Sequence, residues 1–293
     1  MYPAPFEYIA VSSWEEAVEA LIEGGEDARV LAGGQSLVPM MSLRLAKPSV
    51  LVDVNRASDA EVERINGTVE IPALTRHAQL QRSPVLAAAC PLLPEAAAMI
   101  GNVRVRHRGT IGGSLAHGDP AGELPCVAVA AGATVHVLGP GGSRTIAAGD
   151  LFQSYFTTAL EPGEVITRVT VPAFPGRRGS SFVELSRRAG DFASVMVAAV
   201  VDLDETGQRW TDVRVALGSV ADRPLDMSDA LQSFTGGPAS SAAASEAGRT
   251  VAEEVEARDD DRASASYRRR MIEVLTARAL DTATGRARAV MES

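Results

Sequence analysis

The sequence predicts an α+β protein built from three successive units. Each of the first two units has a glycine pair among apolar strands and helices. In the third unit, three apolar strands follow one another and helices come after them. The chain has 293 residues, of which 46% are hydrophobic and 22% charged. This length allows two or three domains, and the composition is that of an ordinary globular protein.

The first unit, residues 1–55, is expected to be a small α/β subdomain. Ser13 and Glu16 have the spacing of a capping box, and apolar residues at helical spacing follow them until Gly24-Gly25. The elements expected after this helix are, in chain order, a strand over Arg29–Ala32, a short helix over Leu37–Leu45 and a strand over Val50–Val54.

The second unit, residues 56–176, is expected to be a larger α+β subdomain. It opens with a hairpin turned at Asn66-Gly67. The alternating Val and Arg residues of Gly101–Arg108 are typical of an extended run. The other elements expected here are helices over Thr75–Leu80, Leu92–Ile100 and Glu123–Ala131, and strands over Val62–Ile65, Val69–Ala73, Thr134–Leu138, Arg144–Ala147 and Val165–Val171.

The third unit, residues 177–293, is expected to be a C-terminal domain with an antiparallel sheet and helices. The Pro- and Gly-rich segment 172–179 predicts a linker before it. Because three strands follow one another directly, they predict an antiparallel meander. The strands are expected over Ser180–Ser186, Val195–Leu203 and Trp210–Leu217, and the helices over Met227–Ser233, Ala242–Ala257 and Ser266–Ala283.

The glycine pair Gly112-Gly113 is the strongest functional signal in the second unit. It removes two side chains, so backbone amides there can come close to a bulky anion. Thr110 and Ser114 flank the pair with hydroxyls that suit phosphate or ribose oxygens. The alternative interpretation is a tight turn between two buried elements.

A second pair, Gly33-Gly34, has the same setting in the first unit. An apolar strand precedes it, and Ser36 stands where a helix is expected to start, a place where free amides attract anions. Two such turns could hold a pyrophosphate group from both sides. Neither is a P-loop, since no Gly-Lys-Ser/Thr follows, and neither is a Gly-x-Gly-x-x-Gly turn.

Together, Ala32-Gly33-Gly34-Gln35-Ser36 and Thr110-Ile111-Gly112-Gly113 resemble the two FAD-pyrophosphate motifs of the medium, flavin-binding subunit of molybdenum hydroxylases. That family includes carbon monoxide dehydrogenase and xanthine dehydrogenase. The similarity runs from Phe6 to about Arg286, with Gln35 where the carbon monoxide dehydrogenase type has His. The resemblance implies a two-part FAD-binding domain of the PCMH type in the first two units, followed by a C-terminal flavoprotein domain.

The resemblance also implies which residues contact FAD. His117 would lie near the phosphates or ribose, and Asp119 and Glu123 at the adenosine end. Phe192 would cover the isoalloxazine ring; the alternative is a core aromatic before a strand. Ile100 and Ile166 would approach the flavin, and Arg187 or Arg188 would attract the reduced, anionic ring. The residues implied around the diphosphate are Val30, Leu31, Ala32, Gly33, Gly34, Gln35, Ser36, Leu37, Thr110, Ile111, Gly112, Gly113 and Ser114.

Partner subunits follow from the same resemblance. Electrons would arrive from a small [2Fe-2S] subunit and leave to NAD, a quinone or oxygen. A large molybdenum-cofactor (molybdopterin) subunit would oxidise an N-heterocycle, an aldehyde or carbon monoxide, within a dimer of heterotrimers. Cys90 and Cys126 are too few to hold an iron–sulfur cluster, so the cluster belongs to another chain. The isolated chain, with no catalytic residue of its own, is expected to leave the substrate unoxidised.

Charge and residue pattern limit the partners, the location and the metal sites that the chain can have. A net charge of −9 argues against nucleic acid or an anionic membrane as the main partner. The N-terminus has no signal-peptide pattern, and the apolar run Val195–Val201 is too short for a transmembrane segment, so a cytoplasmic location is expected. The histidines lack metal-ligand spacing, and Asp259-Asp260-Asp261 is typical of a solvated turn, so no metal site is expected.

Two further interpretations stay open. The basic cluster Arg104, Arg106, His107 and Arg108 is either a solvated face or a contact with a neighbouring subunit or a phosphate.

The rival functions are a self-sufficient FAD-dependent oxidase and a non-enzymatic nucleotide-binding assembly module. The first rival would need acids that orient a substrate, or a His or Cys that links the flavin, and the sequence offers no firm candidate.

Overall fold

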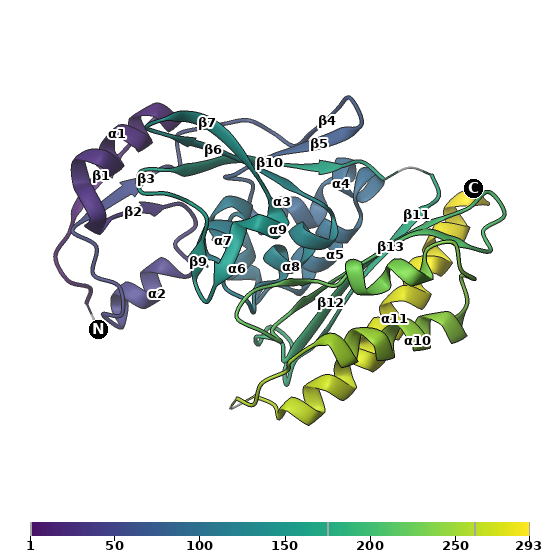
Figure 1. Cartoon of the computed structure of the whole chain (residues 1–293). Helices are drawn as coiled ribbons and strands as arrows, with labels where there is room; N and C mark the ends of the chain where they lie inside the picture. The colour runs from purple at the N-terminus through teal and green to yellow at the C-terminus, as the bar shows by residue number, and fades with distance from the viewer. Residues whose placement is uncertain (1, 175, 261, 293) are drawn as a thin grey trace.

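The computed structural model describes residues 2–174, 176–260 and 262–292, and it confirms the α+β class. Pro175 of the predicted linker and Asp261 of the predicted turn lie outside the described residues. Figure 1 shows a small N-terminal unit at one end of the molecule, a central unit of sheet and helices, and a C-terminal unit at the other end.

The N-terminal unit is a three-stranded parallel sheet in the order β1-β3-β2. Helix α1 packs on it through Ala17, Val18 and Leu21, and Ser13 caps the helix by accepting a 3.1 Å hydrogen bond from the Glu16 amide. Helix α2 is shorter than predicted, because Arg44 adopts a left-handed φ of 59°. The bounds are β1 (Glu7–Ala10), α1 (Trp14–Gly24), η1 (Gly25–Asp27), β2 (Ala28–Leu31), α2 (Leu37–Ser42) and β3 (Val50–Asp53).

The central unit is a five-stranded antiparallel sheet in the order β4-β5-β10-β6-β7, with helices against it. Its bounds are β4 (Glu63–Ile65), β5 (Thr68–Pro72), α3 (His77–Arg82), α4 (Pro84–Ala89), α5 (Leu92–Met99), α6 (Val103–Arg108), α7 (Ile111–His117), α8 (Glu123–Ala130), β6 (Thr134–Gly139), β7 (Gly142–Ala147), α9 (Ala148–Leu151), β8 (Phe152–Ser154), β9 (Thr157–Thr158) and β10 (Val165–Pro172). The predicted hairpin at Asn66-Gly67 is confirmed.

The extended run predicted over Gly101–Arg108 is wrong, because these residues form helix α6. Asn102 caps the helix, and its side-chain oxygen accepts hydrogen bonds from the amides of Arg104 at 2.9 Å and Val105 at 3.2 Å. The alternation of Val and Arg has the period of a strand. In this short segment, however, the hydrogen bonds of the Asn102 cap favour a helix.

The C-terminal unit confirms the predicted antiparallel meander, with β14 added at its edge. Strand β12 is buried on both faces: Met196 and Ala198 pack toward the central unit, whereas Val195 and Val197 pack toward α10 and α11. This explains its continuous apolar run. The bounds are β11 (Arg178–Leu185), β12 (Val195–Leu203), β13 (Trp210–Gly218), β14 (Leu225–Asp226), η2 (Asp229–Phe234), α10 (Ser241–Glu254) and α11 (Ala265–Met291). Among the described residues, no helix is both long and apolar enough to cross a membrane.

Candidate functional site

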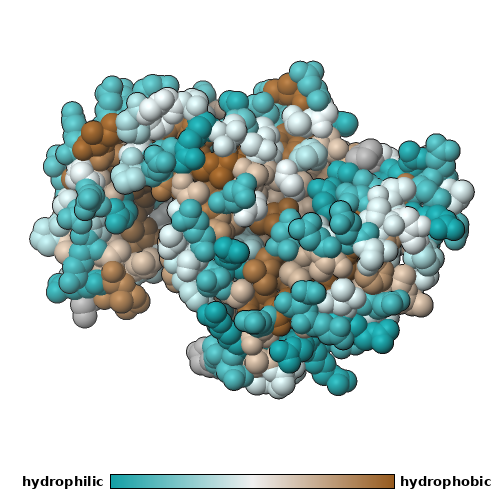
Figure 2. Space-filling view, in the orientation of Figure 1, coloured by the Kyte–Doolittle hydropathy of each residue, from teal (hydrophilic) through white to brown (hydrophobic). Residues whose placement is uncertain are grey.

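A cavity lies at the first glycine pair, between the N-terminal and central units. The cavity has a volume of about 350 Å³ and is lined by residues 31–35 of the first glycine loop, by the first turn of α2, by Asp53 at the end of β3, by Asn55 and by Arg108. Figure 2 shows the surface hollowed where the small unit meets the rest of the molecule. The sequence predicted that the two motifs would share one ligand. The fold packs Gly33 of the first motif against Arg108 and Gly109, which directly precede the second motif; the shared ligand stays a prediction.

The first glycine loop offers unpaired backbone donors. Within the described part of the chain, the amides of residues 33–37 donate no hydrogen bond. Gly34 adopts a φ of 70°, which turns the loop between β2 and α2 and is a conformation that glycine takes without strain. The Gln35 side chain holds the loop by donating to the Gly33 carbonyl at 3.1 Å. A run of free amides around such a turn is a concave anion site.

The second glycine segment differs, because its amides are already used. The Ile111 amide donates to the Thr75 carbonyl at 3.1 Å, and the Gly112 amide donates to the Ala73 carbonyl at 2.9 Å. The Gly113 amide donates to the Thr110 hydroxyl at 3.1 Å, so Thr110 is the N-cap of α7. This segment therefore offers a smooth backbone surface and the Ser114 hydroxyl rather than free amides.

Close packing holds the two segments together. A side chain at Gly33 would place its Cβ 2.3 Å from the Arg108 carbonyl oxygen, so only glycine fits there. A Cβ on Gly113 would lie 4.0 Å from the Ala32 Cβ and 2.9 Å from the Thr110 hydroxyl. The glycines thus bring the two backbones within van der Waals reach of each other beside the cavity.

Arg76 and Asn55, which belong to neither glycine motif, link the first glycine loop to Arg108. The Asn55 side-chain amide donates to the Ala32 carbonyl at 2.9 Å. The Arg76 guanidinium donates to the Asn55 side-chain oxygen at 2.6 Å and to the Arg108 carbonyl. No local motif marks these residues, since their partners lie between 21 and 32 positions away in the chain.

His77 supports the second segment from beneath. Its imidazole lies where a Cβ on Gly109 would fall, and its Nε2 is 3.1 Å from the Thr110 carbonyl oxygen. Burial lowers the pKa of His77 to about 4, so the ring is neutral and Nε2 carries the proton that this carbonyl accepts. Nδ1 has no hydrogen-bond partner among the described residues.

The basic cluster on α6 faces mostly outward. Arg104, His107 and Arg108 are exposed. Arg106 instead turns back and donates to the carbonyls of Ile100 at 2.8 Å and Gly101 at 3.3 Å. Among the described residues, none of these side chains takes part in an ion pair, so the cluster leaves positive charge at the rim of the cavity, where Arg108 lies.

His117, predicted near the phosphates or ribose, ends α7, and the predicted adenosine-end residues Asp119 and Glu123 follow that helix. The His117 ring packs on Phe156 with centroids 5.0 Å apart, and burial lowers its pKa. Asp119 accepts a 2.8 Å hydrogen bond from the Ala121 amide, so part of its capacity is used in a turn. Glu123 begins α8, and burial raises its pKa to about 7. None of the three lines the cavity at the first glycine pair.

Ile100 and Ile166 belong to the core of the central unit. Ile100 ends α5 and is 7% exposed, and Ile166 lies in β10 and is 6% exposed. Only a small edge of either side chain can reach a ligand. Their predicted place beside the flavin stays a prediction.

The loop between β11 and β12 carries Arg187 and Phe192. Gly190 contacts the turn after Ile100, since a Cβ there would lie 2.8 Å from the Gly101 carbonyl oxygen. Phe192 is 56% exposed, so the alternative interpretation as a core aromatic is wrong. The Arg262 guanidinium lies 5.3 Å from the Phe192 ring centroid, a cation–π contact.

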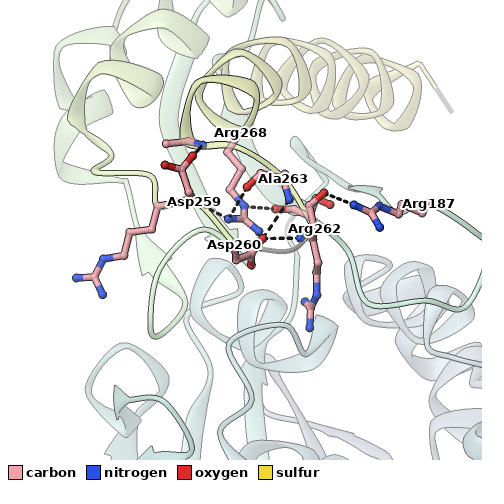
Figure 3. A network of polar contacts seen from close by, with 9 residues as sticks. Arg187, Asp259, Asp260, Arg262, Ala263 and Arg268 are labelled. Atoms are coloured by element: carbon pink, nitrogen blue, oxygen red, sulfur yellow. Dashed lines mark hydrogen bonds and ion pairs between the residues drawn. The ribbon is translucent and has the colours of Figure 1, made fainter.

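A polar network anchors this loop to the start of α11 (Figure 3). Arg268 is buried and donates to the Ser194 carbonyl at 3.1 Å, the Arg258 carbonyl at 2.6 Å and the Asp260 carboxylate at 2.7 Å. Arg187 donates to the Arg262 carbonyl at 3.0 Å. Asp259 and Asp260 are exposed, as the predicted solvated turn requires, and Asp260 in addition pairs with the buried Arg268.

The donor set at the first loop fits the diphosphate of a dinucleotide. The unpaired amides of residues 33–37 supply hydrogen-bond donors, and Arg108 supplies positive charge at the same cavity. Gly113 lies near the first loop, since a Cβ there would be 4.0 Å from the Ala32 Cβ. The fold and this donor set together are those of a protein that can bind a dinucleotide, with the candidate site between the N-terminal and central units.

Comparison with known proteins defines the family. Residues 4–174 match the FAD binding domain in molybdopterin dehydrogenase, and residues 180–283 match the CO dehydrogenase flavoprotein C-terminal domain. The 6-hydroxypseudooxynicotine dehydrogenase complex subunit alpha of Paenarthrobacter nicotinovorans is 40% identical over 100% of this chain and 99% of its own. The carbon monoxide dehydrogenase medium chain of Afipia carboxidovorans is 38% identical over 98% of this chain and 100% of its own.

A solved structure agrees with these sequence matches. Carbon monoxide dehydrogenase from Hydrogenophaga pseudoflava superimposes with a TM-score of 0.94 at 38% identity, covering 98% of this chain and 99% of the other. The chain belongs to the FAD-binding medium subunits of the molybdenum hydroxylases. The family predicted from the two glycine motifs is confirmed, as is the FAD-binding nature of the N-terminal domain.

Proposed function

We propose that this chain is the electron-transfer subunit of a three-component molybdenum hydroxylase. It receives electrons from a small [2Fe-2S] subunit and delivers them to an external acceptor such as NAD, a quinone or oxygen. A large molybdenum-cofactor subunit oxidises the substrate, which is an N-heterocycle, an aldehyde or carbon monoxide. The observation that carries the proposal is the run of unpaired amides at residues 33–37 beside Gly113, in a chain of this family.

The residues of the chain have binding and orienting roles in this proposal. Bound FAD supplies the redox chemistry, so the protein needs no acid–base pair of its own. The amides of residues 33–37 hold the diphosphate, and the Thr110–Ser114 segment forms the facing wall. His117 lies near the phosphates or ribose, and Asp119 and Glu123 serve the adenosine end.

The flavin end is assigned to the loop between β11 and β12. Phe192, held in place by Arg262, covers the isoalloxazine together with the edges of Ile100 and Ile166. Arg187 or Arg188 attracts the reduced ring by charge. We further propose the division into residues 1–55, 56–176 and 177–293, assembly as a dimer of heterotrimers, and a cytoplasmic location.

The substrate is determined outside this chain. The relatives named above include a 6-hydroxypseudooxynicotine dehydrogenase subunit and a carbon monoxide dehydrogenase medium chain, which are 40% and 38% identical to this chain. Similar identity to subunits of enzymes with such different substrates supports a shared electron-transfer role rather than a shared substrate.

Reconstitution tests the proposal. The purified chain is loaded with FAD, reduced with an artificial donor and reoxidised with candidate acceptors, both alone and after mixing with its iron–sulfur and molybdenum partners. We expect flavin reduction and reoxidation from the chain alone, and oxidation of N-heterocycles, aldehydes or carbon monoxide only from the mixture. Substrate turnover by the chain alone would favour a self-sufficient oxidase. Failure to take up FAD would favour a non-enzymatic assembly module.

A further inference from the structure

A second cavity lies on the central unit, where helices α3 and α6 pack against each other. Its volume is about 490 Å³. Helix α3 and the residues at its two ends form most of the wall, and the end of α6 completes it. The lining residues of this α3–α6 pocket are Arg76, Ala78, Gln79, Arg82, Ser83 and His107. None of them lines the cavity at the first glycine pair, so the two cavities are distinct.

The side chains of the α3–α6 pocket are mostly hydrogen-bond donors. Arg82 and His107 are exposed, and neither makes an ion pair or a hydrogen bond with another described residue. The Gln79 side-chain oxygen already accepts a backbone hydrogen bond of 2.7 Å, and the Ser83 hydroxyl oxygen accepts one of 3.2 Å. Their side-chain N–H and O–H groups are left to donate to a ligand. No described residue in the lining is acidic.

Positive charge accumulates at this pocket without a counter-ion. The Arg76 guanidinium donates to the Asn55 side-chain oxygen at 2.6 Å and to the Arg108 carbonyl, which are both neutral acceptors. Burial and the charge of Arg108 lower the pKa of Arg76, and Asp53, which lines the other cavity, acts in the opposite direction. Because neighbouring cations repel one another, a bound anion would stabilise this arrangement.

The donors and the shape of the pocket indicate the class of ligand. Guanidinium groups form strong, charge-assisted hydrogen bonds with phosphate oxygens, and their planar fork matches phosphate geometry. A volume of about 490 Å³ lies in the range of pockets that hold small molecules. A concave pocket therefore favours a small phosphorylated molecule over the acidic surface of a partner protein.

The pocket is next to the proposed FAD site but separate from it. Arg76 lines the pocket, and its guanidinium bonds to Asn55 and to the Arg108 carbonyl, two residues that line the cavity at the first glycine pair. His107 and Arg108 are consecutive residues of α6, and each lines a different one of the two cavities. A ligand in the α3–α6 pocket would therefore bind beside FAD rather than in its place.

We propose that the α3–α6 pocket binds the phosphate group of a small molecule other than FAD, and that Arg82, His107 and Arg76 hold this group. The inference goes beyond the proposed function, because it gives the chain a second ligand and does not depend on electron transfer. The ligand is a phosphate monoester or a diphosphate, which matches several cationic and neutral donors around one pocket.

Calorimetric titration of the FAD-loaded full chain with pyrophosphate tests the inference, because bound FAD occupies the proposed diphosphate site at the first glycine loop. Arg82→Gln removes the charge of an exposed side chain, so the fold should be kept and the Kd for pyrophosphate should rise about tenfold. Arg82→Lys keeps the charge and should restore part of the affinity. Arg249→Gln is the matched control and should bind as wild type does, since Arg249 is exposed on α10 and likewise has no ion pair in the described part of the chain.

Two results would overturn the inference: an equal Kd for pyrophosphate in wild type and Arg82→Gln, or no binding by wild type at millimolar pyrophosphate. Weaker assembly of Arg82→Glu with the partner subunits would then assign this face to an acidic protein surface.

NAD distinguishes the sources of the phosphate. If Arg82→Gln lowers the affinity for NAD and pyrophosphate equally, the ligand is a dinucleotide. If it lowers the affinity for pyrophosphate alone, the ligand is a smaller phosphorylated molecule. A chain that takes up no FAD would instead refute the proposed function.

Discussion

The two glycine pairs are alike in sequence but differ in what their backbones offer. In the first, the amides of residues 33–37 are unpaired among the described residues. In the second, the amides of Ile111, Gly112 and Gly113 already donate to Thr75, Ala73 and Thr110. The first loop is therefore a set of donors for an anion, and the second is a rigid wall placed against it.

Each pair also contains one glycine whose role is packing. A Cβ at Gly33 would fall 2.3 Å from the Arg108 carbonyl oxygen, and one at Gly112 would fall 2.6 Å from the Ala73 Cβ. Gly113 has more room, because the Ala32 Cβ is 4.0 Å away and the nearest atom is a hydroxyl. A glycine pair in a sequence thus combines a structural requirement with a ligand requirement, and only the fold shows which glycine has which role.

Gly33→Val should have the largest effect, and the effect should be on folding. The valine would clash with the Arg108 backbone, which cannot move without displacing the second segment. We expect a loss of about 3–5 kcal/mol in the free energy of unfolding, measured by denaturant titration of the apo chain. Gly149→Ala is the control, because nothing lies within 4 Å of its Cβ position. A normally stable Gly33→Val chain would show that the two segments are not packed as described.

Gly113→Val should instead affect the ligand. The added methyl groups would enter the space between Gly113 and Ala32 beside the cavity, while the fold has more room to adapt. We expect FAD affinity to fall about 100-fold, equivalent to about 2–3 kcal/mol, with a smaller change in stability. Titration of the apo chain with FAD measures this effect. Unchanged FAD affinity would show that the second segment is not part of the FAD-binding site.

Low pH should reduce the free energy of unfolding through His77, which supports the second glycine segment. Its folded pKa of about 4 lies below the unfolded value, so between pH 6.5 and pH 4 the unfolded chain binds a proton that the folded chain does not. Stability from this group is complete above pH 6.5 and decreases as the pH falls, by about 2–3 kcal/mol at pH 4. Unfolding titrations at pH 7, 5.5 and 4.5 should show a shallower decline for His77→Gln than for wild type. If the free energy of unfolding fell equally with pH in both proteins, His77 would not be the cause of the acid destabilisation.

Phe192→Ala should leave both glycine segments intact and change only the ring end of the site. Because the side chain is 56% exposed, the free energy of unfolding should change by no more than about 0.5 kcal/mol. The flavin absorption band or reduction potential should shift if Phe192 covers the ring. An unaltered spectrum and potential would assign the isoalloxazine to another part of the surface.

Much of the fold could be predicted because local signals agree with it. The Asn66-Gly67 hairpin, the Ser13 cap and the C-terminal meander each follow from a short stretch of sequence. Helix α6 was missed because its Val–Arg alternation has the period of a strand, whereas the Asn102 cap decides the outcome.

The site could be predicted in part. The glycine motifs carry the family resemblance and mark the cavity. The hydrogen bonds of Arg76 and Asn55 and the support from His77 depend on contacts between distant segments, which no local pattern encodes. The difference between free and occupied amides could not be predicted either, because it depends on where Ala73 and Thr75 lie in the folded chain.

Amide hydrogen exchange with and without FAD tests the contrast between the two segments most directly. In the apo chain, the amides of residues 33–37 should exchange fast and those of residues 111–113 slowly, because only the latter are hydrogen-bonded. Addition of FAD should slow exchange at residues 33–37 and change residues 111–113 little. If FAD left the exchange of residues 33–37 unchanged, the first loop would not be the diphosphate site, and the account of the two segments would be contradicted.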